Sequence, residues 1–429
     1  MRLVTMVSCE HLVNTGYEIE RRHRKRIMDL KEDRRRTTEP EKRKENTAER
    51  FFRQSLERVR ALRINKSVLI FGAAVILVVL AALYLHFRVS REYDILSTSQ
   101  NEDTQSSAYV CLGRNLLKFG NEGVSLLDQS QQVIWNQTYE MTEPNADVSG
   151  DYAVIYDKNG TSMYVVQAEK PIGAIQVKFP VLEAKVARNG AVAAILEDGE
   201  KTWINYYASD GSLIAENQTS MENPGYPVDL AVSPNGESIL VSYFQLENGI
   251  VSSYVACYNF SDEGQNQVDN IVAGFTYDNI LVPQIVWINE TTAVAFRENG
   301  FSVYDGSGVP KERVAKEVEG EIVSTFYNDK YIGLVFQEGE EDEKYTLKLY
   351  DISGKERVSQ GFDLEYSSIG ISGDRLILYN DTHISMYNLN GTLKFDSDIE
   401  EGAVKYIFQA ASNRYILVSE NGIHTIKTK

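Results

Sequence analysis

The stretch SMYNLNGTLKFD, residues 385–396, decides the fold of this chain. Two apolar runs flank a short turn that begins at Asn388 and contains Gly391. An Asn or Asp side chain at such a place bonds to the nearby backbone, and Gly supplies the positive φ that tight hairpins need. The stretch therefore predicts two antiparallel strands joined by a hairpin, and Tyr387 just before the turn is expected to pack between neighbouring sheets.

The same arrangement recurs along the chain, in INYYASDGSLIAEN (204–217), SVYDGSGVPKERV (302–314) and KLYDISGKERV (348–358). Each copy belongs to a longer unit of four short apolar runs. The second run of each unit begins near residues 116, 152, 191, 238, 292, 331, 375 and 414, at intervals of 36, 39, 47, 54, 39, 44 and 39. Four strands at a period near 40 are typical of β-propeller blades, which are stable only when stacked around a ring.

The count predicts an all-β propeller of eight blades over residues 108–429, with seven blades as the alternative if one unit is miscounted. The last unit, VKYIFQAASNRYILVSENGIHTIKTK (404–429), supplies only three strands. Either an earlier strand, YDILSTS (93–99), completes that blade and closes the ring, or its outer strand is missing.

Two stretches resemble known propeller repeats. LDQSQQVIWN (127–136) resembles PQQ-like repeats, and LAVSPNGESILVSYF (230–244) resembles the starts of WD-like and TolB-like repeats. The whole layout, with one membrane span before the propeller, is similar to an uncharacterised family of single-pass, membrane-anchored bacterial propellers. The resemblance implies a fold, and it implies little about function because propellers host many unrelated functions.

An apolar segment, SVLIFGAAVILVVLAALYLHF (67–87), precedes the repeats and contains no Asp, Glu, Lys or Arg. Its 21 residues would span roughly 31 Å as a helix, which matches the hydrocarbon core of a bilayer. It is longer than the apolar part of a signal peptide and has no polar face. The segment therefore predicts an uncleaved transmembrane helix, followed by a polar stalk over residues 88–107.

Charge flanking the segment predicts its orientation. Residues 47–66 carry six Lys and Arg, against two in residues 88–107. Because positive residues stay on the cytoplasmic side, we expect a cytoplasmic N-terminus and a propeller on the outer side of the cell membrane. Residues 1–45 are charge-dense and are expected to be largely disordered. Residues 46–66 predict a basic amphipathic helix whose arginines reach anionic inner-leaflet lipids or form only a topology signal: Arg53, Arg58, Arg60 and Arg63.

The body of the chain is strongly acidic. Residues 1–66 contain 19 Lys and Arg against 11 Asp and Glu, so the net charge of −17 for the whole chain leaves a surplus of 25 negative charges after residue 66. Nucleic-acid binding by the body is therefore not expected, because phosphate contacts need Lys and Arg. Cys111 and Cys257 lie in apolar runs and are expected to be two buried thiols rather than a disulfide.

No catalytic or metal-ligating motif is found in the repeats. Only His383 and His424 occur after the apolar segment, in different units, and each is expected to be a hydrogen-bonded structural residue. The PQQ-like resemblance invites a quinone cofactor, but the body has no adjacent cysteines, and no cofactor is expected. Trp287, on the first strand of a blade, is the one position singled out for a ligand, since it can line the central channel.

The expected function is a non-enzymatic binding or scaffold module for another envelope component, protein or glycan. That hypothesis predicts an exposed aromatic patch and no convergent carboxylates in the channel. The alternatives are a lyase or hydrolase that uses loop carboxylates, which predicts acids converging on one pocket, and a signalling anchor that acts through its basic head. For the anchor, deleting residues 1–46 abolishes the phenotype while surface display persists.

Overall fold

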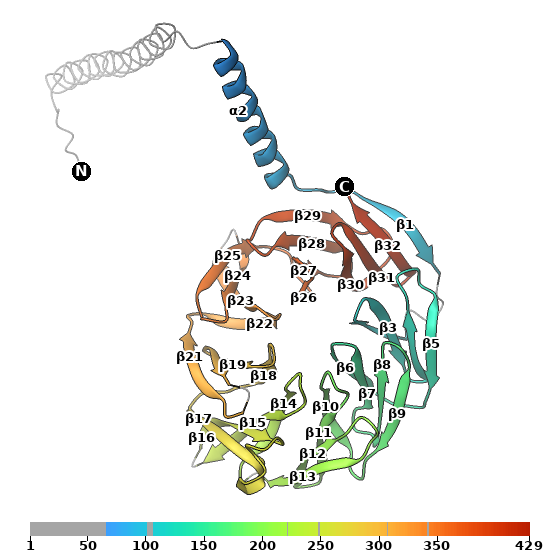
Figure 1. The fold of residues 1–429 in the computed structure, drawn as a ribbon, viewed down its shortest axis with the longest axis vertical. Coiled ribbons are helices and arrows are strands. Elements are labelled where there is room, and N and C mark those ends of the chain that lie inside the picture. Colours follow the sequence, from blue (N-terminus) through green and yellow to red (C-terminus); the bar gives the residue numbers. More distant parts are fainter. Residues whose placement is uncertain (1–65, 101–105, 221, 248, 307, 341–342) are drawn as a thin grey trace, which may run out of the picture. The chain divides into compact units, whose positions relative to one another are not determined.

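The computed structural model describes residues 66–100, 106–220, 222–247, 249–306, 308–340 and 343–429. Eight four-stranded antiparallel sheets, here called blades 1–8, are arranged as a ring (Figure 1). Blade 1 contains β2 (Ala108–Leu112), β3 (Asn115–Gly120), β4 (Gly123–Leu127) and β5 (Val133–Thr138), and blade 2 contains β6 (Pro144–Ser149), β7 (Tyr152–Asp157), β8 (Ser162–Gln167) and β9 (Pro171–Gln176). Blade 3 contains β10 (Val181–Val186), β11 (Val192–Asp198), β12 (Lys201–Tyr207) and β13 (Leu213–Ser220), and blade 4 contains β14 (Tyr226–Val232), β15 (Ser238–Glu247), β16 (Ile250–Asn259) and β17 (Ile271–Asp278).

The second half of the ring follows the same order. Blade 5 contains β18 (Gln284–Trp287), β19 (Thr292–Arg297), β20 (Gly300–Asp305) and β21 (Lys311–Glu317), and blade 6 contains β22 (Glu321–Tyr327), β23 (Tyr331–Glu340), β24 (Glu343–Asp351) and β25 (Glu356–Phe362). Blade 7 contains β26 (Ser368–Ser372), β27 (Arg375–Tyr379), β28 (His383–Asn388) and β29 (Leu393–Asp398), and blade 8 contains β30 (Val404–Ala411), β31 (Arg414–Ser419) and β32 (Gly422–Thr428) together with β1 (Tyr93–Ser99). The prediction of eight blades is confirmed. Their second strands begin within one residue of the predicted positions.

The ring is closed by a strand from the other end of the chain. β1 pairs antiparallel with β32, so that Tyr93 lies opposite Thr428 and Ser99 lies opposite Ile423. Of the two possibilities left open by the sequence, YDILSTS as the outer strand of the last blade is therefore the one observed. This corrects the expected boundary at residue 108, because the segment predicted as a polar stalk contributes a strand to the propeller.

The hairpin that identified the repeat has the predicted form. Gly391 has a φ of 83°, and its N–H donates to the Asn388 carbonyl at 2.9 Å. The side chain that accepts a backbone bond in this turn is Asn390, from the N–H of Thr392 at 3.1 Å, whereas the Oδ1 atom of Asn388 is buried without a partner among the described residues. In the related turn of blade 6, Asp351 does accept from the N–H groups of Ser353 and Lys355.

The hydrophobic core lies between the blades. Tyr350 of blade 6 packs on Phe301 of blade 5 with ring centroids 5.3 Å apart, and Tyr304 of blade 5 packs on Phe275 of blade 4 at 4.4 Å. Both tyrosines directly precede the repeated turn and are almost fully buried. The expectation that this position packs between neighbouring blades is confirmed for these two residues, and it explains why the motif recurs.

Within the described part of the chain, the helix α2 (Lys66–Phe87) precedes the propeller and belongs almost entirely to a separate unit. Over the described ranges, no helix was found with both the length and the apolarity needed to cross a membrane. The predicted membrane span therefore stays a prediction. The disordered head expected over residues 1–45 and nearly all of the predicted helix at 46–66, including its four arginines, lie outside the described residues.

Candidate functional site: a charged cavity in the central channel

The first strands of the blades surround the central channel (Figure 1), and five of them line one cavity of about 120 Å³. Blades 2 to 6 each contribute at least one side chain to it. The polar and aromatic members are Asp147, Ser149, Lys185, Asp229, Gln284, Trp287 and Tyr327. The blade repeat thus brings together residues that are up to 180 positions apart in the sequence.

Two of the acids bind the backbone of the next blade. Oδ2 of Asp147 accepts a hydrogen bond of 2.9 Å from the N–H of Val186, and Oδ2 of Asp229 accepts one of 2.6 Å from the N–H of Ile285. Each carboxyl group therefore joins two neighbouring first strands beside the channel.

Other pairs of blades are joined by neutral groups at comparable places. The Thr325 hydroxyl donates to Oε1 of Gln284 at 2.5 Å, between blades 5 and 6. The Gln409 N–H donates to the Ser372 hydroxyl at 2.8 Å, between blades 7 and 8. Hydrogen bonds therefore join the first strands at four of the blade junctions described, and blades 2 and 4 make these bonds with acids.

A lysine lies among the acids. Nζ of Lys185 is 2.8 Å from Oε1 of Glu183, and the two side chains are 30% and 20% exposed. Burial on its own lowers the pKa of Lys185, but the carboxylates of Glu183, Asp147 and Asp229 outweigh it, so the pKa is raised. Lys185 is therefore charged at neutral pH, and three acids surround it.

The acids hold protons more tightly than free carboxyl groups. Burial raises the pKa of Asp147 to about 6, against the opposing effect of Lys185. Burial, followed by repulsion from Glu183, raises the pKa of Asp229 to about 8, while Lys185 and the Ile285 N–H oppose the increase. Burial thus makes both carboxyl groups bind their protons more tightly than in water, Asp229 more so than Asp147.

Trp287 lies where the sequence placed it, at the end of β18 and in the lining of the channel cavity. Its side chain is 9% exposed, and its indole Nε1 has no hydrogen-bond partner among the described residues. It also packs in the core between blades 4 and 5, with Ala231 and Ile285. Its position in the channel lining is confirmed, and ligand binding by Trp287 stays a prediction.

Acids therefore converge on one pocket, which the binding hypothesis did not expect and the enzyme hypothesis did. They lie on strands rather than loops, and two of them bind main-chain N–H groups. Among the described residues, no group of His, Cys, Asp or Glu is arranged to hold a metal ion. No sequence pattern pointed to the cluster, because each residue occupies an ordinary first-strand position.

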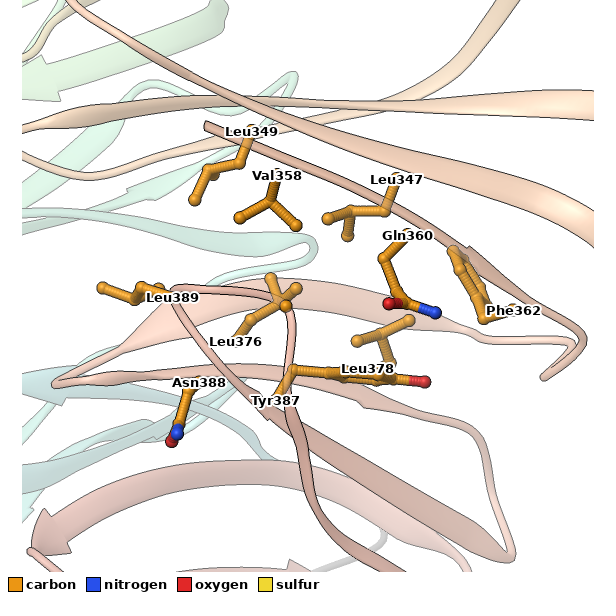
Figure 2. A pocket seen from close by; sticks show the side chains of 11 residues that line it. Leu347, Leu349, Val358, Gln360, Phe362, Leu376, Leu378, Tyr387, Asn388 and Leu389 are labelled. Atoms are coloured by element: carbon orange, nitrogen blue, oxygen red, sulfur yellow. The ribbon is translucent and has the colours of Figure 1, made fainter. Parts of the chain in front are cut away.

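A second, apolar pocket lies between blades 6 and 7 (Figure 2). Its lining includes Leu347, Val358 and Phe362 from blade 6 and Leu376, Leu378 and Tyr387 from blade 7. Its volume is about 10 Å³, roughly the space that one water molecule needs. This pocket is a gap in blade packing and is too small for a ligand.

The cysteines and histidines have structural surroundings. Cys111 and Cys257 are free thiols; Cys257 is buried as expected, whereas Cys111 is only half-buried. His424 lies 3.1 Å from the hydroxyl groups of both Thr98 and Ser419. His383 lies 2.7 Å from Asp398 and 3.0 Å from Asp396. Both histidines are therefore hydrogen-bonded, as expected.

Comparison with solved structures identifies the fold alone. The chain is similar to Sqt1 from Chaetomium thermophilum, with 11% identity over 79% of this chain and 98% of that one, at a TM-score of 0.52. It is similar to Saccharomyces cerevisiae Sqt1, with 13% identity over 80% of this chain and all of that one, at 0.50. BamB from Moraxella catarrhalis is similar at a TM-score of 0.49, with 11% identity over 79% of this chain and all of that one.

No curated protein matches the chain significantly. One family model does match, over residues 86–428, and its match includes β1 together with all eight blades. The chain belongs to the family of unknown function DUF5711.

Proposed function

We propose that this protein is a membrane-anchored, extracytoplasmic propeller that binds another envelope component, protein or glycan, without catalysing a reaction. One observation carries the proposal: Asp147 and Asp229, the acids best placed for chemistry in the channel, are bound by the backbone of the next blade. A carboxyl group held in this way stabilises the ring. The result is a rigid disc with a large surface, which suits binding.

The anchor rests on the sequence of residues 67–87 and on the side chains of α2. Among the residues of α2 whose side chains the structure describes, many apolar ones are exposed, including Ile70 at 70%, Leu77 at 68% and Tyr84 at 67%. Exposed apolar surface on this scale is costly in water and is favourable in lipid. We propose that this helix crosses the cell membrane with its N-terminus in the cytoplasm.

Fractionation and protease protection test the anchor. The full chain is expected in the membrane fraction, and a chain lacking residues 67–87 is expected to leave it. Protease added to intact cells should remove a C-terminal tag and spare an N-terminal one. The reverse pattern, or a full chain recovered without membranes, contradicts the proposal.

The basic segment before the helix is the basis of a proposed lipid contact. We propose that Arg53, Arg58, Arg60 and Arg63 bind anionic lipids of the inner leaflet. A peptide of residues 46–66 should bind vesicles containing phosphatidylserine more tightly than neutral vesicles, and 0.5 M salt should weaken that binding. A peptide with the four arginines changed to glutamine is the control, and equal binding by both peptides contradicts this contact.

Crosslinking in intact cells, followed by mass spectrometry, tests the binding function. A photoreactive residue placed at exposed sites around the ring is expected to capture the same partner from one sector and to miss it from the opposite one. Capture spread evenly over all sectors argues against a specific partner.

The converging acids favour one second candidate, a propeller hydrolase or lyase. For that function Asp229, with a raised pKa, would be the proton donor of the channel. Polysaccharide or peptide substrates should then be cleaved by the wild type, and Asp229→Asn should abolish the cleavage while leaving the fold intact. Equal products from both proteins would exclude this function for Asp229.

A further inference from the structure

A large polar groove lies far from the channel, between the outer strand of blade 3 and blade 4. It has a volume of about 530 Å³. Residues 216–219 of β13 form one wall, and side chains of β15, β16 and β17 form the other. We propose that this groove binds a neutral oligosaccharide chain. The inference deepens the proposed binding function and rests on it.

The groove contains an aromatic side chain set against the sheet. Tyr254 is partly exposed in the groove and stacks on the buried ring of Tyr243, with centroids 6.4 Å apart. Its ring lies over Gly274 of the neighbouring strand, where a Cβ atom would come within 2.7 Å of the Tyr254 Cζ. Gly274 thus leaves room for the ring to lie along β17, as a support for the apolar face of a sugar.

Hydrogen-bonding groups surround that ring. The side chains of Asn217, Gln218, Asn223 and Thr276 line the groove and form no hydrogen bond with another described residue. Amide side chains both donate and accept, which matches the hydroxyl groups of sugars. Such groups lose little when free in water, so they are available to a ligand.

Charge selects the class of ligand. The lining contains two acids, Glu216 and Asp269, and no Lys, Arg or His. Anionic polymers are therefore repelled, and an apolar peptide would leave the amides without partners. A neutral polymer of hydroxyl groups and apolar ring faces fits both conditions, so the oligosaccharide is favoured over a peptide.

Titration of the full-length protein in nanodiscs with cellotetraose, maltotetraose and chitotetraose tests the groove. At least one is expected to bind, and Tyr254→Ala and Gly274→Ala should each weaken that binding by about tenfold or more. Gln218→Ala, an exposed change on the outer strand, should weaken it less. Gln132→Ala, at an exposed turn of blade 1, is the matched control and should bind like the wild type.

The outcomes separate this inference from the function on which it rests. Sugar binding that Tyr254→Ala and Gly274→Ala both reduce supports the groove, provided that both variants keep the wild-type melting temperature. Binding of none of the three sugars overturns it, as does binding that both variants retain, or capture of a peptide by the groove residues. If crosslinking to a partner persists in those cases, the binding function stands and only the groove is wrong.

Discussion

At the scale of single residues, Asp229 combines burial beside the channel with a raised pKa. Asp229 is 8% exposed, hydrogen-bonds to the N–H of Ile285, and has a pKa raised to about 8, first by burial and then by Glu183. Between about pH 4 and pH 8 the folded chain holds this proton more tightly than the unfolded chain. The contribution of Asp229 to stability therefore falls as pH rises through that range.

Asp229→Asn is expected to remove this pH dependence, because the amide oxygen can still accept the Ile285 hydrogen bond and carries no charge. Relative to the wild type, the variant should gain about 1–3 kcal/mol of unfolding free energy between pH 5 and pH 8, a discounted figure from the roughly 1.4 kcal/mol that each pKa unit represents. Urea unfolding at the two pH values measures it.

The control for that experiment is Asp198→Asn, at an exposed hairpin residue of blade 3. It should leave the difference between the two pH values unchanged. If the Asp229→Asn variant and the wild type show the same change in unfolding free energy between the two pH values, the carboxyl group of Asp229 is ionised at both.

At the scale of elements, the closing strand is held partly by a histidine. Burial lowers the pKa of His424, against the opposing effect of Glu401, and His424 lies between Thr98 of β1 and Ser419 of β31. A base whose pKa is lowered on folding stabilises the fold above its unfolded value, near 6.5, and that contribution is lost as pH falls through the lowered pKa. Acid should therefore weaken the closing blade.

The stability of His424→Gln is expected to be less sensitive to acidification from pH 7 to pH 5 than that of the wild type, as measured by urea midpoints.

His383 is the opposite case. Burial alone lowers its pKa, but hydrogen bonds to Asp396 and Asp398 outweigh burial and raise it. Its contribution is present below about pH 6.5 and is lost as pH rises, so His383→Gln should increase sensitivity to acid. Equal responses of the two variants would contradict these assignments.

Deleting β1 is expected to cost about 3–9 kcal/mol, because six residue pairs, with about one hydrogen bond each, join it to β32 and each hydrogen bond contributes roughly 0.5–1.5 kcal/mol. A chain that lacks residues 88–100 should melt lower and aggregate through the exposed edge of β32. A chain that lacks residues 1–65 serves as the control and should melt like the full protein. Identical melting of both deletions would show that β1 is not needed for closure.

The elements also show how far sequence reasoning reaches. The Asp/Asn–Gly turns located the third-to-fourth strand hairpins of blades 3, 5, 6 and 7, because Gly391 and its three counterparts have a positive φ. The side chain that caps a given turn was less predictable: Asn390 does so in blade 7, where Asn388 was expected, because either residue can bond the backbone of so short a turn. The pairing of strand 93–99 could not be settled from the sequence, since its partner strand is distant in the sequence.

At the scale of the whole molecule, the channel cluster lay beyond sequence reasoning. Asp147, Lys185 and Asp229 lie in three different units, and each looks like an ordinary polar residue of a half-exposed strand. Only the ring brings them to one cavity, because equivalent positions of successive blades face the same axis. The geometry of the ring therefore determines which side chains meet in the channel. The local sequence pattern predicts only that the chain forms a ring of blades.

Ring closure should also limit the rate of folding. Thr98 and His424, 326 residues apart, must meet in the last blade, and contacts between such distant residues form slowly. A circular permutant that carries residues 88–100 after residue 429, through a short flexible linker, should refold faster than the wild type. Its stability should be nearly unchanged. Stopped-flow fluorescence measures the refolding rates of the permutant and of the wild type. Equal rates would show that closure of the last blade is not the slow step of folding.

The pairing of β1 with β32 has a consequence for biosynthesis. The ribosome makes residues 93–99 more than three hundred positions before residues 422–428. During that interval both ends of the growing sheet array offer unpaired N–H and C=O groups, which attract other nascent chains. A cell that produces this protein must therefore shelter it from its neighbours until translation has passed residue 428.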